Sequence, residues 1–382
     1  MHTDQLKELY IEPTSYCNLQ CPMCSRRHWR NESIGHMDIK LFDKIIEGMP
    51  DTVERIFFGG VGEPLSHPDI IYMLSEAKKT GRIVEIITNA TLIDKDVSQK
   101  LIETKLDMLW ISLDSIEESC DNIGHSNFAD VMENINIFNK ARFAPYDYAP
   151  RFGYGQMQMN LGIAFVLMKD NKDQLSTLLK KIHTLGISKL KVSHIIPYHK
   201  SQLDQVCYER VLAKNMYNTS GSKSASIDMP FMDITDIPDI LPFAANPSLT
   251  FSVMGKELGI DDSYCRFVEE GVSFVRWDGE ISPCMALLHE NTIHQRGAKY
   301  DVERYIRPCS FGNIKESSIA EIWKNKTYTR FRQRVTDKEF PPCARCSLDL
   351  CEFVESNETD CASNPFPVCG GCLWAQGLIQ CP

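Results

Sequence analysis

Three cysteines near the amino end are the residues with the clearest chemistry. The segment Cys17-Asn-Leu-Gln-Cys21-Pro-Met-Cys24 follows closely on a short run typical of a β-strand. A closed zinc site or a 4Fe-4S cube normally takes four protein ligands, so three thiolates leave one position open unless another residue completes the set. His28 lies four residues beyond Cys24 and completes such a set for zinc. The triplet therefore predicts either an iron–sulfur cluster with an open iron atom or a zinc site that includes His28.

The elements that must position these cysteines alternate regularly over the first two hundred residues. Short β-branched runs are followed by amphipathic helical stretches, which predicts an α/β fold with a parallel sheet and helices outside it, either open and doubly wound or curled into a partial barrel. The predicted strands are Leu9–Glu12, Arg55–Gly59, Arg82–Thr88, Met108–Leu113, Asn160–Leu167 and Ile187–Ile195. The predicted helices lie near Ile39–Gly48, Asp69–Thr80, Asp94–Thr104, Phe128–Ala141 and Lys172–Leu185.

The remainder of the chain is less regular. From about Pro197 to Asp262 the alternation breaks down, and several prolines with a serine-rich stretch predict an irregular connector or an ordered lid. The tail from Phe340 to Pro382 is rich in cysteine and has too little apolar content to fold alone, so we expect metal ions to stabilise it. The sequence thus predicts three units, residues 1–200, 201–262 and 263–382.

The overall composition limits the partners and the compartment. The 382 residues carry a net charge of −10, from 41 Lys and Arg and 51 Asp and Glu, and an acidic chain repels nucleic-acid backbones. No apolar stretch reaches the roughly 18 residues that a membrane span needs, and no export signal is visible near the amino end. We therefore expect a cytoplasmic protein without nucleic-acid or membrane partners, whose 15 cysteines serve metal ligation or catalysis rather than disulfides.

The cysteine triplet and the segment Gly59-Gly-Val-Gly-Glu-Pro64 together resemble the radical S-adenosylmethionine (SAM) superfamily. The spacing C-x3-C-x2-C after a first strand is similar to the cluster motif of that family, although Met23 stands where relatives usually have an aromatic residue. The resemblance implies a partial (β/α)6 barrel of the TIM type, in which Cys17, Cys21 and Cys24 hold a 4Fe-4S cluster. It implies that SAM binds the open iron and that one electron, from an external reductant of the flavodoxin or ferredoxin type, cleaves it. The product is a 5′-deoxyadenosyl radical, which abstracts a hydrogen atom from the substrate.

The same resemblance implies which residues bind SAM. Gly60, Gly62 and Glu63 resemble the motif for the methionine amino group, because glycines let backbone carbonyls approach an ammonium closely and Glu63 adds a negative charge. The positions that resemble contacts to the ribose, the carboxylate and the adenine are Thr88, Asn89, Ser112, Asp114 and Gly162. Most of them follow the carboxyl ends of predicted strands, where parallel α/β folds bind ligands. Relatives commonly pair the carboxylate with an arginine after the fourth strand, and here His125 or Arg142 is a substitute.

A second group of cysteines resembles the SPASM extension of radical SAM enzymes. The spacing matches well at Gly279-x4-Cys284 and at Cys343-x2-Cys346, and more loosely afterwards. The candidate ligands are Cys265, Cys284, Cys343, Cys346, Cys351, Cys361, Cys369, Cys372 and Cys381. The resemblance implies one or two auxiliary 4Fe-4S clusters, the nearer on Cys265, Cys284 and Cys372 and the farther on Cys343, Cys346, Cys369 and Cys381. Cys309 is a further candidate, and one or two structural zinc ions are the alternative.

Longer segments resemble radical SAM/SPASM maturases associated with tungsten-containing aldehyde oxidoreductases. The similarity is carried by Tyr10-Ile-Glu-Pro-Thr-Ser-Tyr-Cys17, by Gly60-Val-Gly-Glu-Pro-Leu-Ser-His-Pro68, by Arg276-Trp-Asp-Gly279 and by the ending that runs from Cys369 to Pro382. It implies a maturase that modifies a peptide, a protein or the pterin cofactor of a metalloenzyme. Two alternatives stay open: a radical SAM enzyme for a small metabolite or cofactor precursor, and a zinc-stabilised scaffold without catalysis.

Overall fold

The computed structural model describes residues 4–29, 31–115, 128–143, 159–182, 184–208, 225–229, 249–253, 256–257, 265–295, 301–337, 339–340, 356, 358–375 and 378–381. Four of the residues singled out above, His125, Cys343, Cys346 and Cys351, lie outside these ranges. None of the described helices is long and apolar enough to cross a membrane.

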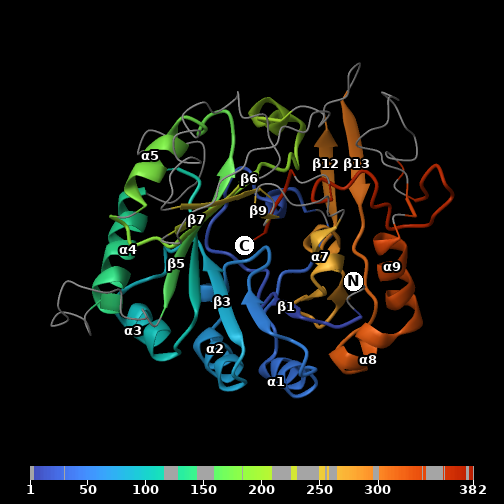
Figure 1. Ribbon diagram of the computed structural model, residues 1–382, viewed down its shortest axis with the longest axis horizontal. Coiled ribbons are helices and arrows are strands. Elements are labelled where there is room, and N and C mark those ends of the chain that lie inside the picture. Colours follow the sequence, from blue (N-terminus) through green and yellow to red (C-terminus); the bar gives the residue numbers. More distant parts are fainter. Residues whose placement is uncertain are drawn as a thin grey trace.

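Eleven strands of the described chain form one sheet, in the order β11-β10-β1-β2-β3-β4-β5-β6-β7-β8-β9. Its central part consists of strands β1 to β6, each parallel to the next. They are β1 (Glu8–Ile11), β2 (Arg55–Phe58), β3 (Ile83–Thr88), β4 (Met108–Ser112), β5 (Asn160–Leu167) and β6 (Lys189–His194). In Figure 1 these strands curve around the middle of the molecule, as the predicted partial barrel requires.

Five helices connect these strands and cover the outside of the barrel (Figure 1). They are α1 (Ile39–Glu47), α2 (Ile70–Lys79), α3 (Lys95–Glu103), α4 (Phe128–Phe143) and α5 (Gln174–Lys181). Helix α1 begins where the Asp38 side chain accepts a hydrogen bond from the Lys40 amide, and it buries Phe42 and Ile45 completely. Burying each such side chain stabilises the fold by about 1.5–3 kcal/mol, so this one apolar face is enough to hold the helix against the sheet.

Beyond β6 the sheet continues through residues that we expected to be irregular. Strand β7 (Ala225–Met229) lies parallel to β6, β8 (Leu249–Val253) lies parallel to β7, and β9 (Lys256–Glu257) returns antiparallel. These strands are regular elements within the segment for which the sequence predicted an irregular connector or an ordered lid. The segment Leu249-Thr-Phe-Ser-Val253 does alternate apolar and polar residues, but the prolines around it obscured the pattern.

The last third of the chain joins the same sheet rather than forming a separate one. Strand β10 (Val272–Val275) pairs in parallel with β1, from Glu8 opposite Val272 to Ile11 opposite Val275, and β11 (Ile281–Ser282) follows antiparallel. The other elements of this part are α7 (Arg266–Glu269), β12 (Asn291–Gln295), β13 (Val302–Ile306), α8 (Ile319–Lys324) and α9 (Lys326–Thr336). Strands β12 and β13 form an antiparallel hairpin above the barrel (Figure 1).

The described end of the chain returns to the barrel. The His194 amide donates to the carbonyl of Leu378 at 3.2 Å, the Gln380 amide donates to Ser193 Oγ at 3.0 Å, and Lys191 Nζ donates to the Cys381 carbonyl at 2.9 Å. The segment 378–381 thus runs beside β6, and Figure 1 places this end of the chain in the middle of the molecule.

One hydrophobic core is shared by the barrel and the last third of the chain. Leu9 and Phe58 of the barrel belong to the same buried cluster as Val275, Ile319 and Tyr328. Because burial of these side chains spans both parts, neither part keeps its core without the other.

Candidate active site

The cysteine triplet lies in the loop that follows β1. Cys17, Cys21 and Cys24 are half-buried free thiols, and the loop ends in a single helical turn, η1 (Ser25–His28), that Cys24 caps. Burial raises the pKa of all three thiols, and the nearby acid Asp114 and the other thiols help to raise that of Cys21 to about 12. Metal binding requires thiolates and therefore releases protons from such thiols.

Arg26 supplies positive charge beside the triplet, which sequence reasoning missed. Burial raises the pKa of Cys17, whereas the Leu19 amide and the Arg26 guanidinium, both hydrogen-bonded to it, lower the pKa. Cys24 also feels the positive charge of Arg26. A cation here stabilises a bound set of thiolates. The only sequence signal was a basic residue two positions after the last cysteine.

The segment from Gly60 to Glu63 packs tightly against the chain that leads into the triplet. Gly60 has φ +118°, and a Cβ built on it would stand 2.5 Å from Glu12 Cγ. A Cβ on Gly62 would stand 2.2 Å from the carbonyl oxygen of Thr14. The Glu63 amide donates to the carbonyl of Tyr16 at 2.8 Å. The glycines are therefore required by the close approach of two backbones, next to the cluster loop.

The Glu63 side chain is buried, and its hydrogen bonds connect this segment to the end of β3. Its carboxylate accepts hydrogen bonds from the Leu65 amide (3.0 Å), Thr88 Oγ1 (2.7 Å) and the Asn89 amide (2.7 Å). Burial raises the pKa of Glu63 to about 7, against the opposing effect of these donors. Three internal donors occupy most of the acceptor capacity of the carboxylate, a role that the sequence did not reveal.

Asn89 extends this connection to the cluster loop. Its side-chain amide donates to Asn18 Oδ1 at 3.0 Å and approaches Cys17 Sγ at 3.9 Å. Its oxygen accepts from the Thr91 amide at 2.9 Å. The structure therefore brings the end of β3, the segment 60–63 and the cysteine triplet together, as the motifs predicted.

The positions predicted on β4 and β5 fall into two groups. Ser112 ends β4, and Asp114 follows it, half-buried and close enough to Cys21 to raise the pKa of that thiol. Asp114 Oδ1 accepts from the Val166 amide at 3.0 Å, and burial raises its pKa to about 6. Gly162 instead lies near the amino end of β5, where a Cβ would meet the Trp110 ring at 2.5 Å. Packing against Trp110 accounts for this glycine.

Arg142 does not take the place of the expected arginine. It donates to Asn139 Oδ1 at 2.8 Å and to the carbonyl of Gly186 at 2.9 Å, and it also reaches the carbonyl of Met159. Met159 and Gly186 precede β5 and β6, so Arg142 lies at the amino ends of the strands. The cysteine triplet follows the carboxyl end of β1, at the opposite edge of the sheet. Arg142 therefore does not replace the arginine that pairs with the SAM carboxylate in relatives. His125 lies outside the described residues.

A second thiol site lies in the last third of the chain. Cys265, Cys284, Cys369 and Cys372 line one largely apolar cavity of about 680 Å³ that includes its opening. Burial raises the pKa of Cys265 to about 12, and burial together with the neighbouring thiols raises the pKa values of Cys284 and Cys369 well above the usual value for a thiol. Four thiols around one cavity are the complete ligand set of a 4Fe-4S cube.

The position of Cys369 corrects the predicted division of ligands. Cys369 was expected on the farther cluster, yet its thiol shares the cavity of Cys265 and Cys372. The reason is local, because the Cys372 amide donates to the Cys369 carbonyl at 3.0 Å in a tight turn that directs both thiols to one side.

The remaining candidate cysteines lie apart from this cavity. The Trp374 indole donates to Cys381 Sγ at 3.4 Å, and Cys381 lies beside Tyr10 of β1. Cys361 is exposed, and Cys309 is half-buried with a pKa that burial raises to about 11. The ligands expected at Cys343, Cys346 and Cys351 lie outside the described residues, so the farther cluster stays a prediction.

The donor sets suit clusters of several iron atoms. Within the described ranges, no three His, Cys, Asp or Glu side chains meet closely enough to hold a single metal ion. A 4Fe-4S cube spreads its thiolates over separate iron atoms, so its ligands stand farther apart than those of one ion. The three thiols of the loop after β1 and the four that line the cavity supply the ligand numbers of such clusters.

Comparison with known proteins establishes the family. The sequence model of the radical SAM superfamily matches residues 11–146, and that of SPASM, an iron–sulfur cluster-binding domain, matches residues 265–347. The tungsten-containing aldehyde ferredoxin oxidoreductase cofactor-modifying protein of Pyrococcus furiosus is 33% identical over 383 residues, covering 99% of this chain and 97% of the relative. The protein belongs to the radical SAM superfamily. It is therefore a radical SAM enzyme that uses 4Fe-4S clusters and SAM, and the zinc-scaffold alternative is overturned.

More distant proteins share the fold. The PqqA peptide cyclase of Rhodopseudomonas palustris is 22% identical over 349 residues, covering 90% of this chain and 80% of the relative. SuiB of Streptococcus suis, solved with SAM bound, superposes with a TM-score of 0.59 at 18% identity, covering 91% of this chain and 72% of SuiB. The partial barrel with its SPASM extension is thus a fold that occurs in radical SAM enzymes.

Proposed function

We propose that this radical SAM enzyme is a maturase whose target is the pterin cofactor of a tungsten-containing aldehyde oxidoreductase, or the metalloenzyme that carries it. The observation that carries the proposal is the similarity along the whole chain to the cofactor-modifying protein of Pyrococcus furiosus. Similarity over 99% of the chain includes the last third, which carries the cavity with four thiols.

The residues of the barrel would divide the work of binding SAM. The chemistry that cluster-bound SAM supplies is one-electron cleavage to a 5′-deoxyadenosyl radical, which takes a hydrogen atom from the substrate. Cys17, Cys21 and Cys24 hold the cluster in this proposal. The main-chain carbonyls of Gly60 and Gly62 would accept hydrogen bonds from the methionine ammonium, because the Glu63 carboxylate already has internal donors.

Polar residues after β3 and β4 would hold the rest of the cofactor. Asn89 and Thr88 shape the side of the pocket next to Cys17, and Asp114 with Ser112 faces it from β4. The packing of Gly162 against Trp110 argues for a supporting role for this glycine. The enclosed barrel excludes water, which protects a carbon radical from side reactions.

The three predicted units have separate tasks in this proposal. Residues 1–200 carry the catalytic cluster, 201–262 connect and extend the sheet, and 263–382 carry the auxiliary clusters. A fully ligated cluster on Cys265, Cys284, Cys369 and Cys372 would relay an electron or stabilise the fold, since no iron would be open for substrate. The electron donor is a flavodoxin or ferredoxin, and a cytoplasmic location keeps these cysteines reduced.

The first test concerns the catalytic cluster. Anaerobically reconstituted protein should hold about 12 iron atoms, and under reduction it should cleave SAM to 5′-deoxyadenosine. Cys21→Ala should abolish cleavage, because the cluster loses one of three ligands. Cys207→Ala, which changes a half-buried cysteine outside the expected ligand sets, is the control and should retain activity. Cleavage by the Cys21 variant would refute the assignment.

The second test concerns the substrate. We expect the pterin cofactor, free or bound to its metalloenzyme, to raise the rate of 5′-deoxyadenosine formation above the rate without substrate. The similarity to a PqqA peptide cyclase makes a peptide the second candidate. A small peptide encoded next to this gene should therefore be tested in parallel. Stimulation by the peptide alone would replace the proposed target.

A further inference from the structure

A buried histidine of the last third of the chain lies between two carboxylates of the barrel part. His289 is 1% exposed, and its Nε2 lies 2.9 Å and 3.0 Å from the two oxygens of Glu12. Its Nδ1 lies 3.4 Å from Glu32 Oε2, and the Trp29 ring packs against the imidazole at 4.7 Å between centroids. Burial lowers the pKa of His289, but the two carboxylates together raise it to about 9. At neutral pH the imidazole is therefore a cation between two anions.

Glu12 connects this histidine to the segment that binds SAM in our proposal. Glu12 directly follows β1, and its Oε2 accepts a hydrogen bond from the Val61 amide at 2.9 Å. On the same side, the absence of a Cβ on Gly60 lets the two chains meet. The Glu12 carboxylate is thus held between His289 and the Gly60–Val61 peptide.

The hydrogen bond fixes the direction of a whole peptide unit. A trans peptide is planar, so its carbonyl points away from its N–H. When Glu12 holds the Val61 N–H, the Gly60 carbonyl is directed to the opposite side. Gly60 has φ +118°. Because glycine can adopt many backbone conformations, this peptide could reorient if no contact held it.

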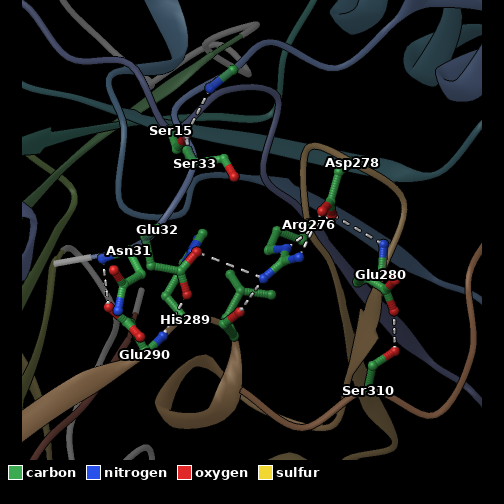
Figure 2. A network of polar contacts seen from close by, with 12 residues as sticks. Ser15, Asn31, Glu32, Ser33, Arg276, Asp278, Glu280, His289, Glu290 and Ser310 are labelled. Atoms are coloured by element: carbon green, nitrogen blue, oxygen red, sulfur yellow. Dashed lines mark hydrogen bonds and ion pairs between the residues drawn. The ribbon is translucent and has the colours of Figure 1, made fainter. Parts of the chain in front are cut away.

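The other side of the network connects Glu32, which lies beside His289, to two stretches of the last third of the chain (Figure 2). Glu32 accepts a hydrogen bond from the Glu290 amide at 2.6 Å and lies 3.8 Å from Arg276 Nη1. Arg276 donates two hydrogen bonds to Asp278, at 2.8 Å and 2.6 Å. Two separate stretches of the SPASM part therefore hold the chain next to the cluster loop.

We propose that His289 is a positioning residue for the SAM-binding segment, because it holds the Glu12 carboxylate that orients the Gly60–Val61 peptide. The inference rests on the proposed function of this segment. Without His289, Glu12 is a buried carboxylate without its cation, and such a group turns toward water or takes up a proton. Either change breaks the hydrogen bond between Glu12 and the Val61 amide. The Gly60 carbonyl is then no longer held in one direction.

The experiment compares His289→Ala and His289→Gln with Asp278→Asn, all as anaerobic full-length holoenzyme with iron content verified. Asp278→Asn breaks an ion pair of the same network without touching Glu12. The first measurement is hydrogen exchange of the peptide that contains Val61, before SAM is added. The second is the equilibrium dissociation constant of SAM.

We expect His289→Ala to keep its iron, to exchange the Val61 amide about tenfold faster and to bind SAM about tenfold more weakly, since a hydrogen bond to a charged group is lost. His289→Gln keeps one N–H donor and should fall between this variant and the wild type. Asp278→Asn should change neither quantity.

Unchanged exchange and affinity in both His289 variants would overturn the proposal. Equal changes in Asp278→Asn would also overturn it, because His289 would then act only through general packing of the two parts. The hydrogen-exchange measurement needs no SAM, so it tests the link from His289 to Val61 even if the wild-type enzyme fails to bind SAM. That failure would instead refute the proposed function.

Discussion

At the scale of single residues, two buried carboxylates hold the segment 60–63 from opposite sides. Glu63 belongs to the segment and is held by donors from the end of β3. Glu12 lies outside it and holds the Val61 amide. A buried carboxylate is stable only with such partners, so each one fixes the backbone around it. The position of this segment is therefore determined by few side chains, and single substitutions should be informative.

Gly62→Ala tests the close approach of the two backbones. Its Cβ would stand 2.2 Å from the Thr14 carbonyl oxygen, so the segment must move. We expect SAM affinity to fall at least about tenfold, with a loss of about 2 kcal/mol in stability. Equilibrium binding and thermal unfolding of the holoenzyme measure the two effects.

Gly48→Ala is the matched control for that substitution. Gly48 follows α1 with φ −86°, and its Cβ would meet the Lys44 carbonyl at 3.1 Å, a contact that a small shift relieves. This variant should bind SAM normally. If Gly62→Ala also binds normally, the segment tolerates displacement and does not contact the cofactor.

The raised pKa of His289 predicts how stability depends on pH. A histidine whose pKa is higher in the folded state contributes its full stability below its unfolded value of about 6.5. This contribution is lost as the pH rises through about 9, the value that Glu12 and Glu32 produce. We expect the wild type to lose about 3 kcal/mol across this window, because the side chain is almost fully buried.

Thermal unfolding of the holoenzyme between pH 6 and pH 10 measures this dependence. His289→Gln cannot titrate, so its unfolding temperature should change less over the same range. Parallel curves for the two proteins would show that other groups cause the loss.

At the scale of elements, the turn after β6 holds the cluster loop in place. This turn is η4 (Lys200–Gln205), and Gln202 within it is buried. Its side-chain amide donates to the carbonyl of Pro22, between Cys21 and Cys24, at 2.8 Å, while its oxygen accepts from the Tyr198 amide at 2.7 Å. The Gln202 side chain thus connects the turn after β6 to the loop that carries Cys21 and Cys24.

Gln202→Ala should loosen the cluster loop. The Pro22 carbonyl loses its donor, so we expect the catalytic cluster to be lost several times faster on exposure to air, with little change in overall stability. Iron content and visible absorbance against time measure this. Gln205→Ala is the control, because Gln205 lies in the same turn and the described hydrogen bonds of its side chain go to Asp170. Equal rates of loss in both variants would contradict the prediction.

Sequence reasoning succeeded where an element is determined by its own residues. Predicted strand Leu9–Glu12 is β1 at Glu8–Ile11, and predicted helix Asp69–Thr80 is α2 at Ile70–Lys79, because local hydrophobic periodicity determines both. Pairing between distant segments has no such signal. The position of β10 beside β1 and the contact between His289 and Glu12 depend on how the whole chain packs. The motif residues were found, but the internal partners of Glu63 were not.

At the scale of the whole molecule, the cavity with four thiols joins distant parts of the chain. Cys265 and Cys284 flank β10, whereas Cys369 and Cys372 belong to a turn near the end. A cluster there would cross-link these two distant segments. Folding of this part should therefore depend on iron.

The assignment of Cys369 to this cavity predicts an iron count that differs from the alternative. Cys265→Ala and Cys369→Ala should each lose about four iron atoms, and the double variant should lose no more, because both thiols serve one cluster. Iron analysis of the anaerobically purified proteins measures this. A loss of about eight atoms in the double variant would place Cys369 on a second cluster.

The pairing of β1 with β10 has a consequence for synthesis on the ribosome. Glu8 lies opposite Val272, so β1 emerges well before its neighbour β10, which is made 264 residues later. At about 5–20 residues per second, that interval is some tens of seconds. Until then one row of backbone N–H and C=O groups of β1 has no partner, and such an edge can pair with other chains. Nascent chains of this enzyme should therefore need shielding by chaperones until β10 has emerged.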